Sequence, residues 1–324
     1  MKKILVIAIS SVAAMAFLLL VYYNVKIANR NTVETLINEK KMINILVAGS
    51  NNYRDDRYSF FSIVSINPEN GNIGITFIPP SFRVFMDDDN SDPARIDEIE
   101  FSNFNRIMIQ VAFRRTLRLN VPYFIEIYSP DVKRIVDLLE GIDIFILDQM
   151  KDQPELSFGV NYFDGEKTMK YINSVEGGSI YLKFDRAQDI ISTLYYNKER
   201  YRKFFTPELV TEIFKSVKTN MVPQEIMKIG KIIFSNGMLT SVMLPGSLEG
   251  KYYVTDDIAY KIYEGEFLKN LVLESDKEPV TKIKILNGTD EPGLARKMRS
   301  DLIREGLNVV EFGTSSYQRM AESI

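Results

Sequence analysis

Three short apolar runs between residues 42 and 84 form the most regular hydrophobic pattern in the chain. Residues 43–48, 60–66 and 73–78 each predict a buried strand. A polar and charged loop follows the first run, and a turn rich in Asn, Pro and Gly separates the second from the third. Because α/β proteins place binding sites where strand ends converge on a loop-rich edge, we expect a site near these loops.

Helical and strand patterns alternate through the following residues. Amphipathic stretches, with apolar positions at the 3.6-residue period, lie at 104–117, 130–139, 183–205, 207–217, 224–233 and 258–267. Runs typical of strands lie at 122–127, 142–147 and 251–254. This alternation predicts an α/β fold, with a mixed central sheet flanked by helices.

A charged segment that ends in proline, residues 274–280, is the predicted linker to a second domain. Beyond it, residues 281–286 alternate with period two, residues 293–305 are amphipathic, and residues 307–312 are apolar. We therefore expect a main domain over 42–273 and a small C-terminal α/β domain over 281–324, and the sequence leaves open whether this small domain is complete.

The N-terminus has the pattern of a membrane anchor. Lys2 and Lys3 precede an uncharged run over residues 4–24, and a transmembrane helix needs roughly 20 apolar residues. A cleaved signal peptide is the alternative, since Ala14-Met15-Ala16 matches a cleavage site, but the apolar run continues past it. We predict a single-pass anchor over 1–24 and a linker over 25–41. The two lysines favour a cytoplasmic N-terminus, which leaves the bulk of the chain outside the cytoplasmic membrane.

The composition excludes several classes of function. The 324 residues include no Cys and no His, which excludes disulfides, thiol nucleophiles and catalytic triads that use histidine. The formal net charge of −3 gives no support for a nucleic-acid partner. Any catalysis must depend on carboxylates, Lys, Arg, Tyr or a cation held by oxygen atoms.

Several short motifs of the main domain resemble the LytR-CpsA-Psr family. They are Asn44-Ile45-Leu46 with Gly49, Arg57, Ser65-Ile66-Asn67-Pro68, Ile78-Pro79 with Arg83-Val84, Asp164-Gly165-Glu166 with Tyr171, and Arg186 with Gln188. The tail resembles the family's C-terminal LytR-associated domain in Ile285-Leu286-Asn287-Gly288-Thr289, Pro292-Gly293-Leu294-Ala295, Gly306 and Val309-Val310.

The resemblance implies a site for a charged lipid. Members of the family transfer glycopolymers from a polyprenyl-pyrophosphate carrier to peptidoglycan, using Mg²⁺, acidic residues and arginines. The implied pyrophosphate-binding residues are Arg57, Arg83, Arg95 and Arg186. The carboxylates left as candidate Mg²⁺ ligands are Asp55, Asp56 and Asp164. Each arginine has the alternative role of a surface ion-pair partner.

The chain departs from the family pattern where that pattern has carboxylates. Asn51, Ser59 and Ser81 stand at positions of aspartates, and Pro80 stands at the position of an arginine. We therefore predict an envelope protein that binds a polyprenyl-phosphate lipid, a polyprenyl-linked glycan or peptidoglycan, with weak or no catalysis and no assigned catalytic residue. One alternative is an active Mg²⁺-dependent phosphotransferase with relocated carboxylates, and another is a structural or partner-binding role.

Overall fold

The computed structural model describes residues 33–53, 57–85, 93–146, 156–173, 180–215, 217–269, 271–272, 283–289, 291, 294–304 and 309–314. The predicted anchor, residues 1–24, lies outside the described residues.

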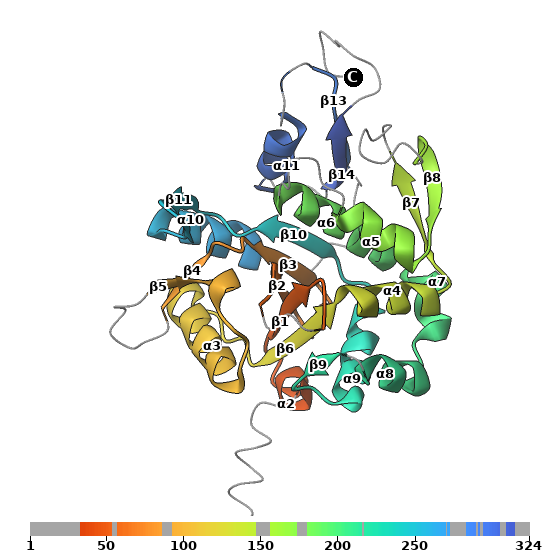
Figure 1. Cartoon of the computed structure of the whole chain (residues 1–324), viewed down its shortest axis with the longest axis horizontal. Helices are drawn as coiled ribbons and strands as arrows, with labels where there is room; N and C mark the ends of the chain where they lie inside the picture. Colours follow the sequence, from red (N-terminus) through yellow and green to blue (C-terminus); the bar gives the residue numbers. More distant parts are fainter. Residues whose placement is uncertain are drawn as a thin grey trace, which may run out of the picture.

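The predicted mixed central sheet is confirmed. It has six strands in the order β10-β3-β2-β1-β6-β9, with β1 parallel to β6, β10 parallel to β3, and the other neighbours antiparallel (Figure 1). These strands are β1 (Ile43–Ser50), β2 (Phe60–Ile66), β3 (Ile73–Ile78), β6 (Tyr123–Tyr128), β9 (Lys218–Thr219) and β10 (Leu239–Met243).

Four strand pairs lie outside this sheet. Three are antiparallel: β4 (Arg83–Phe85) with β5 (Pro93–Arg95), β7 (Ile142–Ile146) with β8 (Gly159–Phe163), and β11 (Ser247–Glu249) with β12 (Tyr252–Val254). The fourth is the parallel pair β13 (Ile283–Asn287) and β14 (Val309–Thr314).

Helices cover both faces of the central sheet (Figure 1). One face packs against α3 (Asn103–Leu117), α10 (Asp257–Ile262) and the π-helical turn η5 (Tyr263–Leu268). The other packs against α2 (Val33–Asn38), α6 (Ile180–Tyr196) and α9 (Pro223–Ile233). The remaining helices are η2 (Ile96–Glu98), α4 (Ser129–Leu138), α5 (Gly165–Asn173), α7 (Lys198–Tyr201), η4 (Arg202–Phe204), α8 (Pro207–Phe214) and α11 (Leu294–Arg304).

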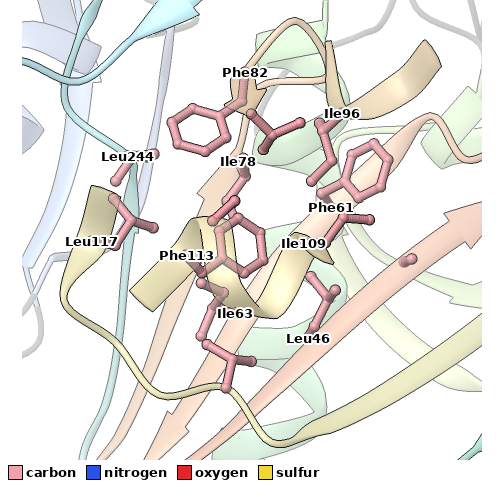
Figure 2. Close-up of a cluster of buried hydrophobic side chains, with 14 of the residues drawn as sticks. Leu46, Phe61, Ile63, Ile78, Phe82, Ile96, Ile109, Phe113, Leu117 and Leu244 are labelled. Atoms are coloured by element: carbon pink, nitrogen blue, oxygen red, sulfur yellow. The ribbon is translucent and has the colours of Figure 1, made fainter. Parts of the chain in front are cut away.

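The alternation of apolar residues along β1 explains the two cores. Leu46 and Ala48 belong to the cluster under α3, whereas Ile43 and Ile45 belong to the cluster under α6. Successive side chains of a strand point to opposite faces, so an apolar run predicts a strand that is buried on both sides. Figure 2 shows part of the first cluster, in which Phe113 is completely buried.

Several elements differ from the sequence predictions. The strands β4, β5, β8, β9, β10 and β11 were not predicted, and the helix expected over 183–205 is divided into α6, α7 and η4. Strand β10 is short and carries Thr240 and Ser241, so its hydrophobic alternation is weak. Pairing with β3 from residue 239 to residue 243 is what makes it a strand.

Candidate functional site

A pocket of about 470 Å³ opens at the β10 edge of the central sheet, between α6 and α10. We call it the edge pocket. It is lined by Phe77, Tyr181, Phe184, Asp185, Gln188, Ser241, Val242, Met243, Pro245, Gly246, Ser247, Tyr253, Asp256, Ile258, Ala259, Ile262, Tyr263, Phe267 and Arg299. Ligand sites are typically about 300–1,000 Å³ and mostly apolar with a few polar groups, and this pocket fits that description.

Three aromatic rings connect the edge pocket to the start of β2. Phe77 of β3 stacks on Phe184 of α6 with the ring centroids 5.1 Å apart. Phe60 lies edge-on to both rings, at 6.0 Å from Phe77 and 5.8 Å from Phe184. Phe60 follows Arg57 by three residues. The start of β2, three residues after Arg57, therefore packs directly against the pocket wall.

The loop that follows β3 contacts a lining residue of the same pocket. Phe77 lines the pocket near the end of β3, and the residues after it are Ile78-Pro79-Pro80-Ser81. The carbonyl of Ser81 accepts a hydrogen bond from the backbone N–H of Tyr253, another lining residue, at 2.8 Å. The segment that resembles a family motif is therefore hydrogen-bonded to a residue that lines the pocket.

A side chain from the C-terminal region completes one wall. Arg299 of α11 donates through Nη2 to Ser241 Oγ at 3.1 Å and to Gln188 Oε1, and both acceptors line the pocket. Its guanidinium also lies over the ring of Phe312, 4.9 Å from the centroid. Arg299 is the one cationic side chain among the described lining residues, and the acidic ones are Asp185 and Asp256.

Two of the predicted arginines lie side by side. Arg83 and Arg95 face each other across the β4–β5 pair. Arg83 Nη1 donates to Glu249 Oε2 at 3.4 Å, and Arg95 donates to both carboxylate oxygens of Asp97, at 2.9 and 2.5 Å. The hydrogen bonds to Asp97 raise the pKa of Arg95. Both arginines thus take part in local ion pairs.

Arg186 lies apart from that pair and is buried. Its Nη1 donates to the Tyr171 carbonyl at 2.7 Å, and its guanidinium lies over the Tyr171 ring. The Tyr171 hydroxyl donates to Asp189 Oδ2 at 2.8 Å. Burial, followed by the charge of Asp189, raises the pKa of Tyr171 well above its usual value. Arg186 therefore joins α5 to α6, whereas the β4–β5 pair packs on the core at the other face of the sheet.

Of the remaining predicted residues, the structure describes Arg57 and Asp164. Arg57 is exposed just before β2, and Asp55 and Asp56 are outside the described residues. Asp164 accepts a hydrogen bond from the Lys167 N–H at 2.8 Å, which places its carboxylate at the start of α5 as a cap.

The described residues do not fit a Mg²⁺ site. Within the described ranges, no three or more acidic side chains are grouped so that they could hold a metal ion. Of the positions where the resemblance implies carboxylates, Asn51 accepts a hydrogen bond from Ser129 Oγ at 3.3 Å, and the Ser59 N–H donates to the Gly49 carbonyl at 3.0 Å. Neutral amide and hydroxyl groups give such a cation less charge than carboxylates do.

The sequence did not predict a buried polar group that contacts Tyr58, the residue after Arg57. Glu126 of β6 is 1% exposed and pairs with Arg106 of α3. It also accepts a hydrogen bond from the Tyr58 hydroxyl at 2.6 Å. A lone Glu within the apolar run of β6 was the available signal, since a charged residue inside a predicted buried strand requires a partner. The lining residues of β10 and α11 gave no comparable signal.

Comparison with known families gives a match over most of the chain. The profile of the LytR_cpsA_psr family matches residues 20–273. The chain belongs to this family. The resemblance stated from the short motifs is thereby confirmed at the level of the family, which is a family of the cell envelope. A comparison with curated protein sequences finds no significant match.

Solved structures share the LytR_cpsA_psr fold with this chain. TagV from Bacillus subtilis is 16% identical with a TM-score of 0.57, and the alignment covers 73% of this chain and 99% of TagV. TagT bound to LIIa-WTA is 15% identical with a TM-score of 0.57, covering 72% and 91%. Lmo1026 from Listeria monocytogenes is 19% identical with a TM-score of 0.52, covering 72% and 98%.

None of the helices within the described residues is long and apolar enough to span a membrane.

Proposed function

We propose that this protein is a single-pass, extracytoplasmic LytR_cpsA_psr protein that binds a polyprenyl-linked glycan or wall material, with weak or no catalysis. The edge pocket is the observation that carries the proposal. Its volume is about 470 Å³, and aromatic and aliphatic side chains supply most of its walls. Such a pocket favours a hydrocarbon chain, because burying apolar surface releases it from water.

The neighbouring arginines supply the charge for the head group. Arg57 is exposed and lies three residues before Phe60, which packs against the pocket wall. Arginine matches a phosphate with two parallel N–H donors, which makes it suited to a pyrophosphate. The exposed Arg57 is our first candidate for the head group, and Arg83, Arg95 and Arg186 are further candidates.

Weak catalysis follows from the residues that replace acidic ones. Asn51, Ser59 and Ser81 stand where the family pattern has aspartates. Phosphoryl transfer needs its developing charge neutralised, and a metal held by carboxylates commonly does this. A chain with neutral groups at these positions keeps a binding surface and loses most of that stabilisation, as a pseudoenzyme does.

The predicted location of the domain agrees with the same proposal. The predicted anchor over residues 1–24 would hold the domain at the outer face of the cytoplasmic membrane, where a lipid-linked glycan is presented. TagT, which shares the fold, is bound to LIIa-WTA in one structure and to LI-WTA in another. A ligand of that chemical class is the natural first test for the edge pocket.

Binding of short prenyl probes tests the proposal. Farnesyl pyrophosphate, farnesol and inorganic pyrophosphate are titrated by calorimetry into the full chain in lipid nanodiscs, with empty nanodiscs subtracted. We expect farnesyl pyrophosphate to bind most tightly and Arg57→Ala to weaken it about tenfold or more, as for a lost charged hydrogen bond. Farnesol binding should be unchanged in that variant. Equal affinity for inorganic and farnesyl pyrophosphate would show that the prenyl chain contributes nothing to binding, and would overturn the proposed role of the edge pocket.

The active enzyme is the second candidate, since Asp55 and Asp56 directly precede Arg57 in the sequence. Relocated carboxylates there would sit beside the head group. Release of the carrier from a polyprenyl-pyrophosphate glycan, measured with and without Mg²⁺, separates the two candidates. Mg²⁺-dependent turnover that disappears in Asp55→Asn, Asp56→Asn or Arg57→Ala would establish the enzyme and overturn the binding-only function.

A further inference from the structure

Two tyrosines in the loop between β1 and β2 are held by two buried carboxylates. The Tyr58 hydroxyl donates to Glu126 Oε2 at 2.6 Å, and the Tyr53 hydroxyl donates to Asp131 Oδ1 at 2.8 Å. Glu126 is 1% exposed and Asp131 is completely buried. The loop carries Arg57 between these two tyrosines, so both sides of the arginine are fixed to the same neighbouring segment.

That neighbouring segment runs over residues 126–131, at the end of β6 and the start of α4. It contacts the loop in two further places. The hydroxyl of Tyr128 lies 2.9 Å from that of Tyr58, and its ring lies 4.9 Å from the ring of Tyr53. Because Tyr58 donates its proton to Glu126, Tyr128 donates to Tyr58. One short segment therefore contacts a described residue on each side of Arg57.

The carboxylates are themselves fixed. Glu126 Oε1 pairs with Arg106, and Asp131 Oδ2 accepts from the backbone N–H of Tyr128 at 3.0 Å. Burial, with the hydrogen bonds to Glu126 and Tyr128, raises the pKa of Tyr58 well above its usual value, so its hydroxyl stays protonated. Every hydrogen bond of the group thus has a defined direction.

Stability alone does not explain such a group. Removing a carboxylate from water costs several kcal/mol, and a buried ion pair is often no more stable than well-packed apolar residues. What a buried, fully paired polar group supplies is one defined arrangement, because every alternative leaves a charge unpaired. The group is therefore suited to hold the loop in a single position.

We propose that Glu126 and Asp131 are positioning residues, which hold Tyr58 and Tyr53 and thereby present Arg57 to the head group of the ligand. We call these four residues the loop clamp. Neither carboxylate contacts the ligand. The role of Arg57 rests on the proposed function, whereas the fixing of the loop can be tested without any ligand.

Hydrogen exchange of the full chain tests the loop itself. Tyr58→Phe removes one hydroxyl and keeps the ring, and Tyr53→Phe does the same at the exposed side. Tyr195→Phe is the matched control, because the Tyr195 hydroxyl donates to the Gly237 carbonyl at 2.6 Å, away from the loop. We expect exchange of the Ser59 amide to rise about tenfold in Tyr58→Phe and less in Tyr53→Phe. Exchange that is unchanged in both variants would overturn the loop clamp.

Binding of farnesyl pyrophosphate tests whether the loop clamp acts through Arg57. In the double-mutant cycle, Tyr58→Phe should weaken binding several-fold in the wild-type background and have no further effect in the Arg57→Ala background. Additive losses would show that Tyr58 acts independently of Arg57, and would overturn the positioning role. If Arg57→Ala alone leaves binding unchanged, the proposed head-group site fails, while faster exchange at Ser59 would still establish that the tyrosines hold the loop. If Tyr58→Phe does not fold, the same cycle with Tyr53→Phe decides the role.

Discussion

The loop clamp and the edge pocket are built from different kinds of side chain. The loop clamp is polar, with Tyr58 and both carboxylates buried and Tyr53 exposed, and each hydroxyl and carboxylate in it has a hydrogen-bond partner. The edge pocket is walled mostly by aromatic and aliphatic side chains, and one wall comes from α11 in the C-terminal region. A polar network specifies one geometry, whereas an apolar pocket accepts any ligand of suitable length and shape.

This contrast indicates a division of labour within the site. Apolar attraction has little directionality, so the edge pocket can retain a chain without orienting its head group. Orientation must come from directional contacts, and the loop that carries Arg57 is where such contacts are concentrated. Four variants would test the contrast, and they are given from the largest expected effect to the smallest.

The largest effect is expected from Glu126→Ala. Arg106 is 14% exposed in its side chain and would lose its buried partner. Breaking a buried pair by removing one member costs about 3–5 kcal/mol. The free energy of unfolding, measured by urea unfolding followed with circular dichroism, should therefore fall by that amount. Glu69→Ala, which breaks the exposed pair with Lys40, should leave the unfolding midpoint unchanged. A shift as small as that of the control would mean that the buried network is not needed for stability.

Ala259→Phe is expected to block the edge pocket while preserving the fold. Ala259 lines the pocket from α10, so the larger side chain should occupy the space that the proposed prenyl chain would fill. We expect farnesol and farnesyl pyrophosphate binding to weaken about tenfold or more, equal to about 1.4 kcal/mol. Lys261→Phe, at an exposed position of the same helix, is the matched control. Unchanged binding in Ala259→Phe would show that the prenyl chain binds outside the edge pocket.

Arg299→Ala should loosen the contact between α11 and the rim of the pocket. The variant loses hydrogen bonds to Gln188 and Ser241, each worth about 1 kcal/mol. Faster proteolysis within residues 294–304, with the main domain still intact, would show the effect. Lys297→Ala, on the same helix and exposed, should leave the cleavage rate as it is. Equal rates in both variants would mean that Arg299 contributes nothing to docking.

The smallest effect on stability is expected from Arg83→Ala. Its ion pair with Glu249 spans 3.4 Å at the surface, and such pairs contribute about 0–1 kcal/mol. Stability should therefore change little, and calorimetry with farnesyl pyrophosphate gives the informative result. A loss of affinity without a loss of stability would place Arg83 at the head group, and no change in either would leave it a surface ion-pair partner.

The sequence predicted most of the fold because its signals are local. Residues 60–66 and 73–78 were predicted as strands and are strands, since an apolar run bounded by turns needs no distant partner to be recognised. The same holds for the strand–helix–strand order of β13, α11 and β14. Strand β10 was missed because its character depends on β3, which lies far away in the sequence.

The site was predicted less completely. Short motifs identified the loops and their arginines, but they did not show that Arg83 and Arg95 pair across β4–β5, or that Arg186 is buried against Tyr171. Glu126 and Arg299 were not predicted, because their partners are 68 and 111 residues away along the chain. No pattern of spacing connects residues at such separations.

The sequence by itself determined the apolar strands of the central sheet, most of the helices and the family resemblance, because hydrophobic periodicity and short motifs depend on neighbouring residues. The tertiary structure decided which polar side chains meet. In the folded chain, Glu126 accepts a hydrogen bond from Tyr58, Phe60 packs against the wall of the edge pocket, and Arg299 lines that pocket. These contacts depend on strand order and helix packing, since only the folded chain brings residues so distant in sequence within a few ångströms of one another.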